Sequence, residues 1–288
     1  MEKRKLGNST LEVSRLGYGS WALAGRGWIG VNDRDAVSTV EASLEYGVTF
    51  FDTAPVYGFG KSEEILGNVL SGCREDAVIA TKCGLEWNNT GKVSHCLSRD
   101  GIMRSIEGSL RRLRTDYIDL YQIHWPDAAT PLSETMTVLN ELRAHGAIRE
   151  IGVCNLSPEQ TEEACRHATV VSYQGLYNYL QRDAEEKILP LCREKGISFI
   201  SYSSLAQGML GGNCRPGYVP GRNDIRRFNP LFCEEETLNR SMEEVGRLGK
   251  RPASTSLQFL AANDTVSSML VSMTKRKHLE ENVSALTA

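Results

Sequence analysis

Four residues of this sequence could together deliver a proton to a carbonyl oxygen that is being reduced. They are an acid, a phenol, an amine and an imidazole: Asp52, Tyr57, Lys82 and His124. A free tyrosine donates protons slowly at neutral pH because its pKa is about 10. A nearby Lys82 ammonium would stabilise the phenolate and lower that pKa. Asp52 would hold the ammonium in place, and His124 could donate a hydrogen bond to the substrate oxygen.

Each of these residues also has an ordinary structural interpretation. A lone lysine or aspartate at a strand end is more often part of a surface ion pair, and a lone tyrosine in a loop is usually packing. A histidine beside Trp125 and Pro126 can be a satisfied core residue. Four such coincidences at one place in the fold are much rarer than any one of them. The elements that position the four residues therefore decide between the two interpretations.

Short apolar runs alternate with longer amphipathic segments along almost the whole chain. We expect strands at residues 15–20, 49–53, 78–83, 118–124, 150–155, 170–174, 197–203 and 268–273. We expect helices at residues 33–46, 61–70, 98–113, 132–145, 158–167, 184–194, 234–248, 253–262 and 277–286. Nearly continuous apolar strands joined through helices indicate a parallel sheet covered on its outer face. Eight such units predict an α/β fold, a closed (β/α)₈ TIM barrel.

Several helix starts carry a local signal. Asn32 or Asp33 can cap the first helix, and Ser133 can cap the fourth. Ser157 followed by Pro158 is typical of a capped helix with proline in its first turn.

Two further segments complete the expected architecture. Residues 5–13, with a turn at Gly7-Asn8, predict a β-hairpin that caps the barrel bottom. Residues 208–230, rich in Gly, Pro and Arg, predict a long irregular loop after the seventh strand, where barrel loops carry function. No linker divides the chain, so we expect one domain spanning residues 1–288.

Residues at the carboxyl ends of barrel strands face the active site. Asp52 ends the second expected strand, and Tyr57 follows it in the loop. Lys82 ends the third strand and His124 the fourth. The next three strands end at Asn155, Gln174 and Tyr202. The barrel fold therefore predicts that the acid, phenol, amine and imidazole meet at one rim.

Composition argues against several classes of function. A net charge of −3, with only short basic clusters, predicts no nucleic-acid partner. No apolar run approaches a membrane-spanning length, and the charged first residues lack the apolar core of a secretory signal. The eight cysteines show no zinc-like spacing, which favours reduced thiols. We expect a cytoplasmic protein that holds no metal and does not bind membranes.

Several segments resemble the signature segments of the aldo-keto reductase family. They are DTAPVYGFGKSEEILG, the lysine in IATKCGLEW, and YIDLYQIHWPD, followed in the same order by IGVCNLS, QGLYN, SYSSLAQGML and HLEEN. The similarity covers essentially the whole chain. It extends to the bacterial branch of the family that includes general stress reductases.

The resemblance implies a reductase that uses a nicotinamide cofactor, most often NADP(H), on a small carbonyl or alcohol substrate. It makes Tyr57 the general acid, tuned by Lys82, with Asp52 supporting the lysine and His124 orienting the substrate. It also implies cofactor contacts: Asn155 and Gln174 at the nicotinamide carboxamide, Tyr202 on its ring, Ser203, Leu205, Gln207 and Gly208 by the pyrophosphate, and Glu281 and Asn282 by the adenine.

The sequence departs from the family pattern near its end. Ser272-Met273-Thr274 stands where many members have Gly-x-Arg, so the arginine that clamps the 2′-phosphate of NADP is missing from its usual place. Lys275 or Arg276 could substitute for it or could simply be solvated. NADP(H) is therefore expected, with NAD(H) left open. The family's usual C-terminal tail is also absent after residue 288, which predicts an open, broad substrate site.

Three rival motifs fit poorly. Residues 17–22 match a Rossmann phosphate fingerprint but are not followed by a helix. Tyr57 and Lys61 match the Tyr-x-x-x-Lys pair of short-chain dehydrogenases, but two intervening glycines indicate a loop, so Lys82 is the better partner. A metal-dependent hydrolase would need histidines clustered at strand ends, and only His124 lies at one.

Two functions remain after these comparisons of motifs. The first is reversible reduction of an aldehyde or ketone by NADPH. The alternative is a redox-sensing regulatory protein that binds nicotinamide on the same scaffold with little turnover. The four intact catalytic-type residues favour the enzyme. Near the strand ends lie aromatic side chains that could line a pocket for sugars or hydrophobic carbonyls, or serve only in packing: Trp21, Trp28, Trp87 and Trp125.

Overall fold

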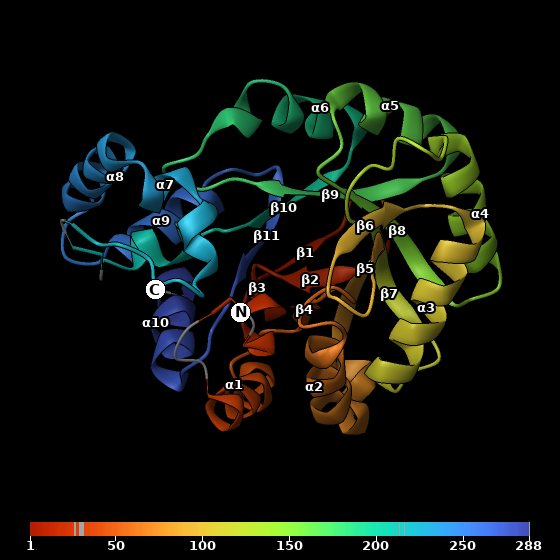
Figure 1. Ribbon diagram of the computed structural model, residues 1–288, viewed down its shortest axis with the longest axis horizontal. Coiled ribbons are helices and arrows are strands. Elements are labelled where there is room, and N and C mark those ends of the chain that lie inside the picture. Colours follow the sequence, from red (N-terminus) through yellow and green to blue (C-terminus); the bar gives the residue numbers. More distant parts are fainter. Residues whose placement is uncertain (26, 29–31, 213, 216, 288) are drawn as a thin grey trace.

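Eight parallel strands close into a barrel in the computed structural model of the chain (Figure 1), which describes every residue except 26, 29–31, 213, 216 and 288. Each strand pairs in parallel with the next, and the last pairs with the first. The strands are β3 (Leu16–Gly19), β4 (Phe50–Asp52), β5 (Val78–Trp87), β7 (Ile118–Ile123), β8 (Ile148–Cys154), β9 (Val170–Leu176), β10 (Ser198–Tyr202) and β11 (Val266–Val271). The prediction of a (β/α)₈ barrel is confirmed.

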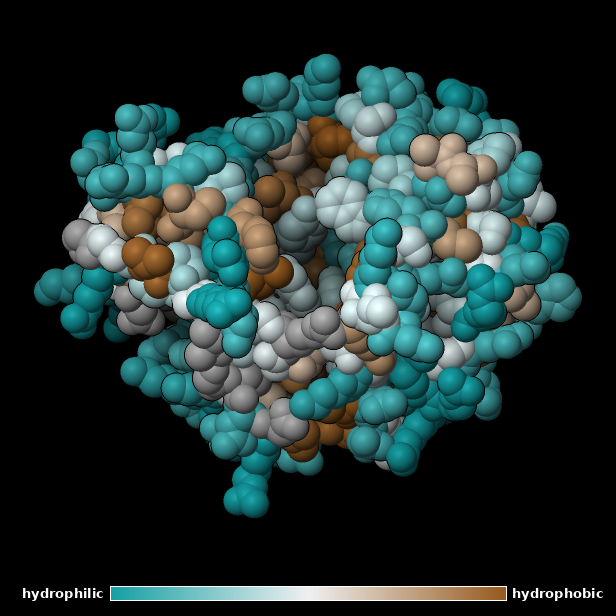
Figure 2. Space-filling model, in the orientation of Figure 1, coloured by the Kyte–Doolittle hydropathy of each residue, from teal (hydrophilic) through white to brown (hydrophobic). Residues whose placement is uncertain are grey.

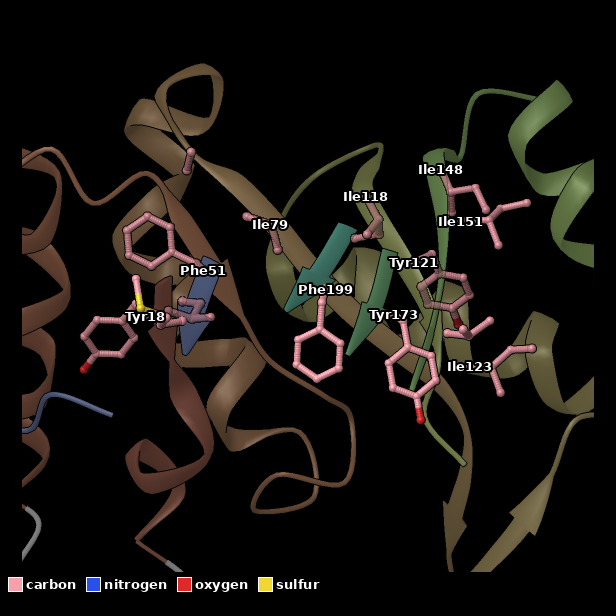
Figure 3. Close-up of a cluster of buried hydrophobic side chains, with 14 of the residues drawn as sticks. Tyr18, Phe51, Ile79, Ile118, Tyr121, Ile123, Ile148, Ile151, Tyr173 and Phe199 are labelled. Carbon is pink, nitrogen blue, oxygen red and sulfur yellow. The ribbon is translucent and has the colours of Figure 1, made fainter. Parts of the chain in front are cut away.

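Helices surround the barrel on its outside (Figure 1). They are α1 (Asp33–Glu45), α2 (Lys61–Leu70), α3 (Arg99–Leu113), α4 (Leu132–Ala144), α5 (Pro158–His167), α6 (Ile188–Lys195), α7 (Pro230–Cys233), α8 (Glu235–Arg247), α9 (Pro252–Ala261) and α10 (Arg276–Thr287). Their apolar faces pack on the outward side chains of the strands to form the largest core cluster. Figure 3 shows the strand side of this cluster, from Tyr18 on β3 round to Phe199 on β10. Among the described residues, no helix is long and apolar enough to cross a membrane.

The helix starts follow the sequence signals with two exceptions. Asn32 caps α1, and Ser157 caps α5 in a full capping box. The predicted cap at Ser133 is wrong: α4 begins one residue earlier, after Pro131, and no side chain caps it. The helix predicted at 184–194 is divided into a 3-10 turn, η3 (Asp183–Glu185), and α6, because Pro190 can occupy only the first turn of a helix.

The bottom of the barrel is closed by the N-terminal hairpin. Its strands, β1 (Lys3–Lys5) and β2 (Glu12–Ser14), pair antiparallel around a turn that is wider than the predicted one. Leu6 and Val13 are fully buried among side chains from the barrel interior, which include Phe50, Ala80, Leu120, Val171, Ile200 and Leu270. The predicted hairpin is confirmed, and its apolar side chains pack into the lower end of the barrel.

The third barrel strand is longer than predicted. Its pairing with β7 ends at Cys83, but β5 continues to Trp87 and pairs antiparallel with β6 (Val93–Cys96). The two strands form a hairpin beyond the barrel rim. Lys82 therefore still lies at the rim, although it is in the middle of a strand.

The connection after β10 is folded into short turns. η4 (Ala206–Gly211) and η5 (Ile225–Phe228) interrupt the segment that the sequence predicts as one irregular loop. The amide of Ile225 donates a hydrogen bond to the carbonyl of Gly27, at 2.8 Å. Residues 224–228 consequently contact the segment that follows β3 and η1 (Ser20–Ala24).

Candidate active site

A buried ion pair lies at the carboxyl ends of β4 and β5. The Nζ atom of Lys82 is 2.7 and 2.8 Å from the two carboxylate oxygens of Asp52, and it donates a further hydrogen bond of 2.8 Å to the carbonyl of Thr53. Lys82 is fully buried and Asp52 is 3% exposed. Burial by itself lowers the pKa of Lys82, but the Asp52 charge outweighs burial and raises the pKa above its usual value. The lysine is therefore a fixed ammonium.

Two glutamines also bind Asp52. The side-chain amide of Gln174 donates to Asp52 Oδ2 at 2.7 Å, and that of Gln122 donates to the same oxygen at 3.3 Å. Gln122 is fully buried, and Gly152 leaves it room, since a Cβ there would lie 2.9 Å from the Gln122 side chain. Gln122 was not among the residues predicted from the sequence. Strand alternation could have found it, because it lies two residues before His124 and so on the same inward side.

Tyr57 lies beside this pair, in the loop between β4 and α2. Its ring stacks on Trp21 with centroids 6.1 Å apart, and its ring centroid is 5.1 Å from Lys82 Nζ. Burial raises the pKa of Tyr57, while the charge and hydrogen bond of Lys82 oppose that rise. The phenol is therefore protonated at neutral pH, next to a cation that stabilises its conjugate base.

The Tyr57 loop is anchored through Ser62 on α2. The Ser62 hydroxyl donates to Ser20, with 2.9 Å to the backbone oxygen and 2.8 Å to Oγ, and it accepts from Thr53 Oγ1 at 3.2 Å. All three side chains are fully buried. These contacts tie the loop to β4 on one side and to the segment that carries Trp21 on the other.

His124 follows β7 directly and faces Tyr57. The two ring centroids are 5.8 Å apart in an edge-to-face arrangement, and the backbone amide of His124 donates to the carbonyl of Cys83 at 2.9 Å. Burial, and then the charge of Lys82, hold the pKa of His124 well below its usual value. The imidazole is therefore neutral, with one nitrogen that donates and one that accepts. The four residues predicted to meet at one rim do lie together.

Asn155 and Tyr202 form a second group next to the four. The Asn155 side chain donates to the carbonyl of His124 at 3.0 Å and accepts from the hydroxyl of Tyr202 at 2.9 Å. Asn155 has a φ of 56°, a left-handed conformation that asparagine tolerates. Among the described residues, neither the second amide hydrogen of Asn155 nor the side-chain oxygen of Gln174 has a hydrogen-bond partner.

The segment after β10 has an unusual backbone. Ser203, Ala206, Gln207 and Gly208 all have positive φ values, which curl the chain into an open turn. A Cβ on Gly208 would meet no atom within 4 Å, so space lies next to it. The Gln207 side chain accepts a hydrogen bond of 3.0 Å from Asn229, whereas Leu205 packs against the core.

The last three predicted cofactor residues are on or beside α10. Lys275 and Glu281 are exposed, and Glu281 lies 3.6 Å from Lys277 in an ion pair. Asn282 is 5% exposed. The helix α9 contacts both α10 and η4, so it connects the two sets of predicted cofactor residues. The neighbouring Arg276 is engaged by Glu280 and Glu45 on the outer surface.

A cavity of about 480 Å³ opens next to Tyr57. Its lining residues are Trp21, Gly27, Val56, Gly58, Phe59, Gly91, Val93, Arg222, Asn223, Asp224, Ile225, Arg227 and Phe228. They come from the segment after β3, the Tyr57 loop, the β5–β6 hairpin and the connection after β10. Figure 2 shows a hollow near the centre of the face that carries these elements, with hydrophobic side chains on part of its wall.

The four tryptophans have different positions. Trp21 lines the cavity, and Trp28 packs edge-on against it with centroids 5.2 Å apart. Trp87 stacks on Phe59, which brings the β5–β6 hairpin against the Tyr57 loop. Trp125 is 41% exposed and is not in the cavity wall. The expected aromatic pocket therefore involves Trp21 directly, Trp28 and Trp87 through their contacts with lining residues, and not Trp125.

The structure also agrees with the rejection of the two dehydrogenase motifs. A short 3-10 turn, η1, follows β3 where a Rossmann fingerprint requires a long helix. Lys61 begins α2, while Tyr57 lies before it in the loop, with Gly58 and Gly60 both left-handed. The two residues are not on one helix face, which agrees with the loop expected from sequence.

Comparisons with known proteins agree with this geometry. The model of the aldo/keto reductase family matches residues 15–288. Aldo-keto reductase YhdN of Bacillus subtilis is 39% identical over 87% of this chain and 76% of its own length. The NADH-specific methylglyoxal reductase of Escherichia coli is 35% identical over 99% and 94%. The solved structure of glycerol dehydrogenase AKR11B4 from Gluconobacter oxydans superimposes with a TM-score of 0.91 at 31% identity, covering 99% and 90% of the two chains.

Proposed function

The chain belongs to the aldo/keto reductase family, and from this membership we propose that it reduces aldehydes or ketones to alcohols reversibly, with NADP(H) as cofactor. Family membership by itself supports an oxidoreductase that depends on a nicotinamide cofactor. The finer proposal rests on one observation. A fixed ammonium, Lys82, lies beside a protonated phenol, Tyr57, at the edge of a cavity that can hold a small molecule.

Each of the four residues has a distinct role in this proposal. The cofactor, when bound, supplies the hydride that reduces the carbonyl carbon. Tyr57 gives its proton to the carbonyl oxygen, and Lys82 stabilises the phenolate that remains. Asp52 keeps Lys82 charged and in position. His124, being neutral, donates a hydrogen bond that orients the substrate oxygen and supports its developing charge.

The polar groups at the rim that have no hydrogen-bond partner among the described residues suit an amide ligand. One amide hydrogen of Asn155 and the side-chain oxygen of Gln174 provide a donor and an acceptor, which match the acceptor and donor of a nicotinamide carboxamide. We assign Tyr202 to the face of the nicotinamide ring. The curled segment after β10 would hold the pyrophosphate through Ser203, Leu205, Gln207 and Gly208. Lys275, Glu281 and Asn282 would hold the adenosine end.

NADP(H) is the proposed form of the cofactor, and NAD(H) is its competitor. The relative from E. coli is named as NADH-specific, and the residues that precede α10 here lack the family's usual arginine. Titration with NADPH and NADH, followed by the change in protein fluorescence, decides between them. Tighter binding of NADH would overturn the NADP(H) assignment without affecting the proposed chemistry.

The exchange of Tyr57 for phenylalanine tests the chemistry. Tyr57→Phe should lower kcat by about 10²- to 10⁴-fold while cofactor binding persists, because only the transferable proton is lost. Tyr46→Phe, which removes the hydroxyl of a half-buried tyrosine that donates to Glu280 on the outer surface, serves as the matched control and should keep full activity. Activity is read as nicotinamide absorbance with a panel of aldehydes and ketones. Normal turnover by Tyr57→Phe would remove Tyr57 from the mechanism.

The same assay addresses the regulatory alternative. A nicotinamide-binding sensor would bind cofactor with similar affinity but would turn over none of the carbonyl compounds. Steady turnover that depends on Tyr57 is the result we expect. We also assign the protein to the cytoplasm, in keeping with its eight cysteines, all of which are free in the structure.

A further inference from the structure

The cavity beside Tyr57 has two kinds of wall. Trp21, Val56 and Phe59 form the side next to the catalytic residues. Ile225 and Phe228, from the connection after β10, form the other. A ligand with an apolar or aromatic body would contact both walls. Such walls give little specificity by themselves, because apolar contacts are not directional.

Two arginines interrupt this apolar lining. Arg222 and Arg227 both border the cavity, and within the described part of the chain neither has a carboxylate oxygen within 4.0 Å. The contrast with Arg226, which lies between them in sequence, is clear. Arg226 is paired with Asp224, with contacts of 2.5 and 2.9 Å. Asp224, the acid in the wall, is therefore already neutralised.

The two arginines are held near each other. One guanidinium nitrogen of Arg227 donates to the backbone oxygen of Arg222 at 3.0 Å, which leaves its remaining N–H groups unpaired by any described acid. Both residues also border a second cavity of about 510 Å³, whose other lining residues lie between 217 and 239. The two guanidinium groups thus lie between two cavities, in a chain whose overall net charge is −3.

We propose, as an extension of the proposed reductase function, that this site selects carbonyl compounds that carry an anionic group, a carboxylate or a phosphate, bound by Arg222 and Arg227. The guanidinium group binds both anions with a planar pair of donors. A neutral substrate of the same shape gains nothing from these residues. The carbonyl end lies toward Tyr57 and His124, and the anionic end lies toward the connection after β10.

The competing use for these arginines is the cofactor's phosphates. The two uses differ in which kinetic constant changes when an arginine is removed. Loss of a substrate contact raises KM for an anionic carbonyl compound and leaves KM for the cofactor unchanged. Loss of a cofactor contact raises KM for the cofactor and leaves KM for the anionic carbonyl compound unchanged.

The experiment uses three aldehydes of similar size: para-carboxybenzaldehyde, its methyl ester and para-formylphenyl phosphate. The unmodified protein should reduce both anions with a higher kcat/KM than the ester, and added salt should shrink the difference. Comparison of kcat/KM for the carboxylate and the phosphate shows which anion the site prefers. Equal kcat/KM values for the ester and both anions would overturn the proposal.

Substitutions then test the arginines themselves. Arg222→Gln and Arg227→Gln should each lower kcat/KM for the anions by about fivefold and the double variant by more, with the ester unaffected. Arg227→Lys should restore part of the loss. Arg166→Gln on α5 removes the same charge far from the site and is the matched control. A rise in KM for the cofactor alone, in the arginine variants, would contradict the proposal.

A binding measurement separates this inference from the proposed function. Terephthalate, which carries two carboxylates and no aldehyde, is titrated by calorimetry into the unmodified protein and the double variant. Weaker binding by the double variant supports the anion site even if no aldehyde is reduced, in which case only the reductase function fails. Equal affinity of both proteins for terephthalate overturns the anion site even if the ester is reduced normally.

Discussion

The ammonium of Lys82 is bound by both carboxylate oxygens of Asp52, and no part of the lysine side chain reaches solvent. The two charges of such a buried pair depend strongly on each other. Both charges have lost their hydration, so each relies on the other and on the surrounding donors and acceptors. This arrangement explains how a cation can be kept permanently next to Tyr57 in the interior of a barrel.

Removal of one partner should therefore destabilise the whole protein. We expect Lys82→Met to lower the free energy of unfolding by about 3–5 kcal/mol, because Asp52 is left charged and buried. The double variant Asp52→Asn/Lys82→Met should lose less than the sum of the two single variants. Urea unfolding followed by circular dichroism measures all three. A loss below about 1 kcal/mol in Lys82→Met would show that Asp52 does not depend on the lysine in the folded protein.

Gln122 should behave as a positioning residue for Asp52. Gln122→Leu removes one of the donors on Asp52 Oδ2, which we expect to cost about 1–3 kcal/mol of stability and to lower kcat. Gln122→Glu keeps the shape but places a second carboxyl group beside Asp52, so the variant should lose more stability and more kcat than Gln122→Leu. Its kcat should recover at acid pH as the new carboxyl group is protonated. A flat kcat–pH profile in Gln122→Glu would argue against this role.

Gln174 allows a direct comparison with Gln122. Both donate to the same oxygen of Asp52, but only Gln174 is assigned to the nicotinamide carboxamide. Gln174→Leu should therefore raise KM for the cofactor, whereas Gln122→Leu should leave it unchanged. Equal effects of the two substitutions on cofactor KM would mean that Gln174 acts only through Asp52.

His124 should make stability depend on pH. Because its pKa is held well below 6.5 in the folded protein, the unfolded chain binds a proton here that the folded protein does not. Stability is therefore complete above pH 6.5 and falls as the pH decreases toward the folded pKa, by up to about 1.4 kcal/mol per pH unit. His124→Gln should make the decline in unfolding free energy shallower below pH 6.5. An unchanged slope in urea titrations at several pH values would show that the folded imidazole titrates normally.

The close packing of α2 on α3 can be tested with two glycines. A Cβ on Gly67 would lie 2.2 Å from the backbone oxygen of Arg112 and 2.7 Å from Leu113 Cα, so Gly67→Ala should cost about 1–3 kcal/mol. Gly72, just after the same helix, has open space around it, and Gly72→Ala should be neutral or slightly stabilising. Thermal unfolding of both variants provides the comparison. Equal melting temperatures would show that the two helices can separate at no cost.

Local features of the sequence were sufficient to place the four residues that we propose to be catalytic. Strand runs with an inward period of two, joined through amphipathic helices, predict both the barrel and the rim at which Asp52, Lys82 and His124 meet. The loop position of Tyr57 follows from the two glycines that come after it, Gly58 and Gly60. These signals are readable because secondary structure and strand-end position depend on residues close together in the chain.

Contacts between distant segments were decided only by the tertiary structure. The partners of Asp52 Oδ2 come from Gln122 and Gln174, which are 70 and 122 residues away in sequence. The arginines of the cavity reach it because the connection after β10 bends back to Gly27, a contact that no periodic pattern encodes. The amino-acid sequence by itself thus determined the barrel and the rim at which the four residues meet, whereas the fold of the chain across the barrel mouth determined which charged side chains border the cavity. The physical reason is that strand and helix patterns are local, while side-chain pairing across a barrel depends on closure of the whole sheet.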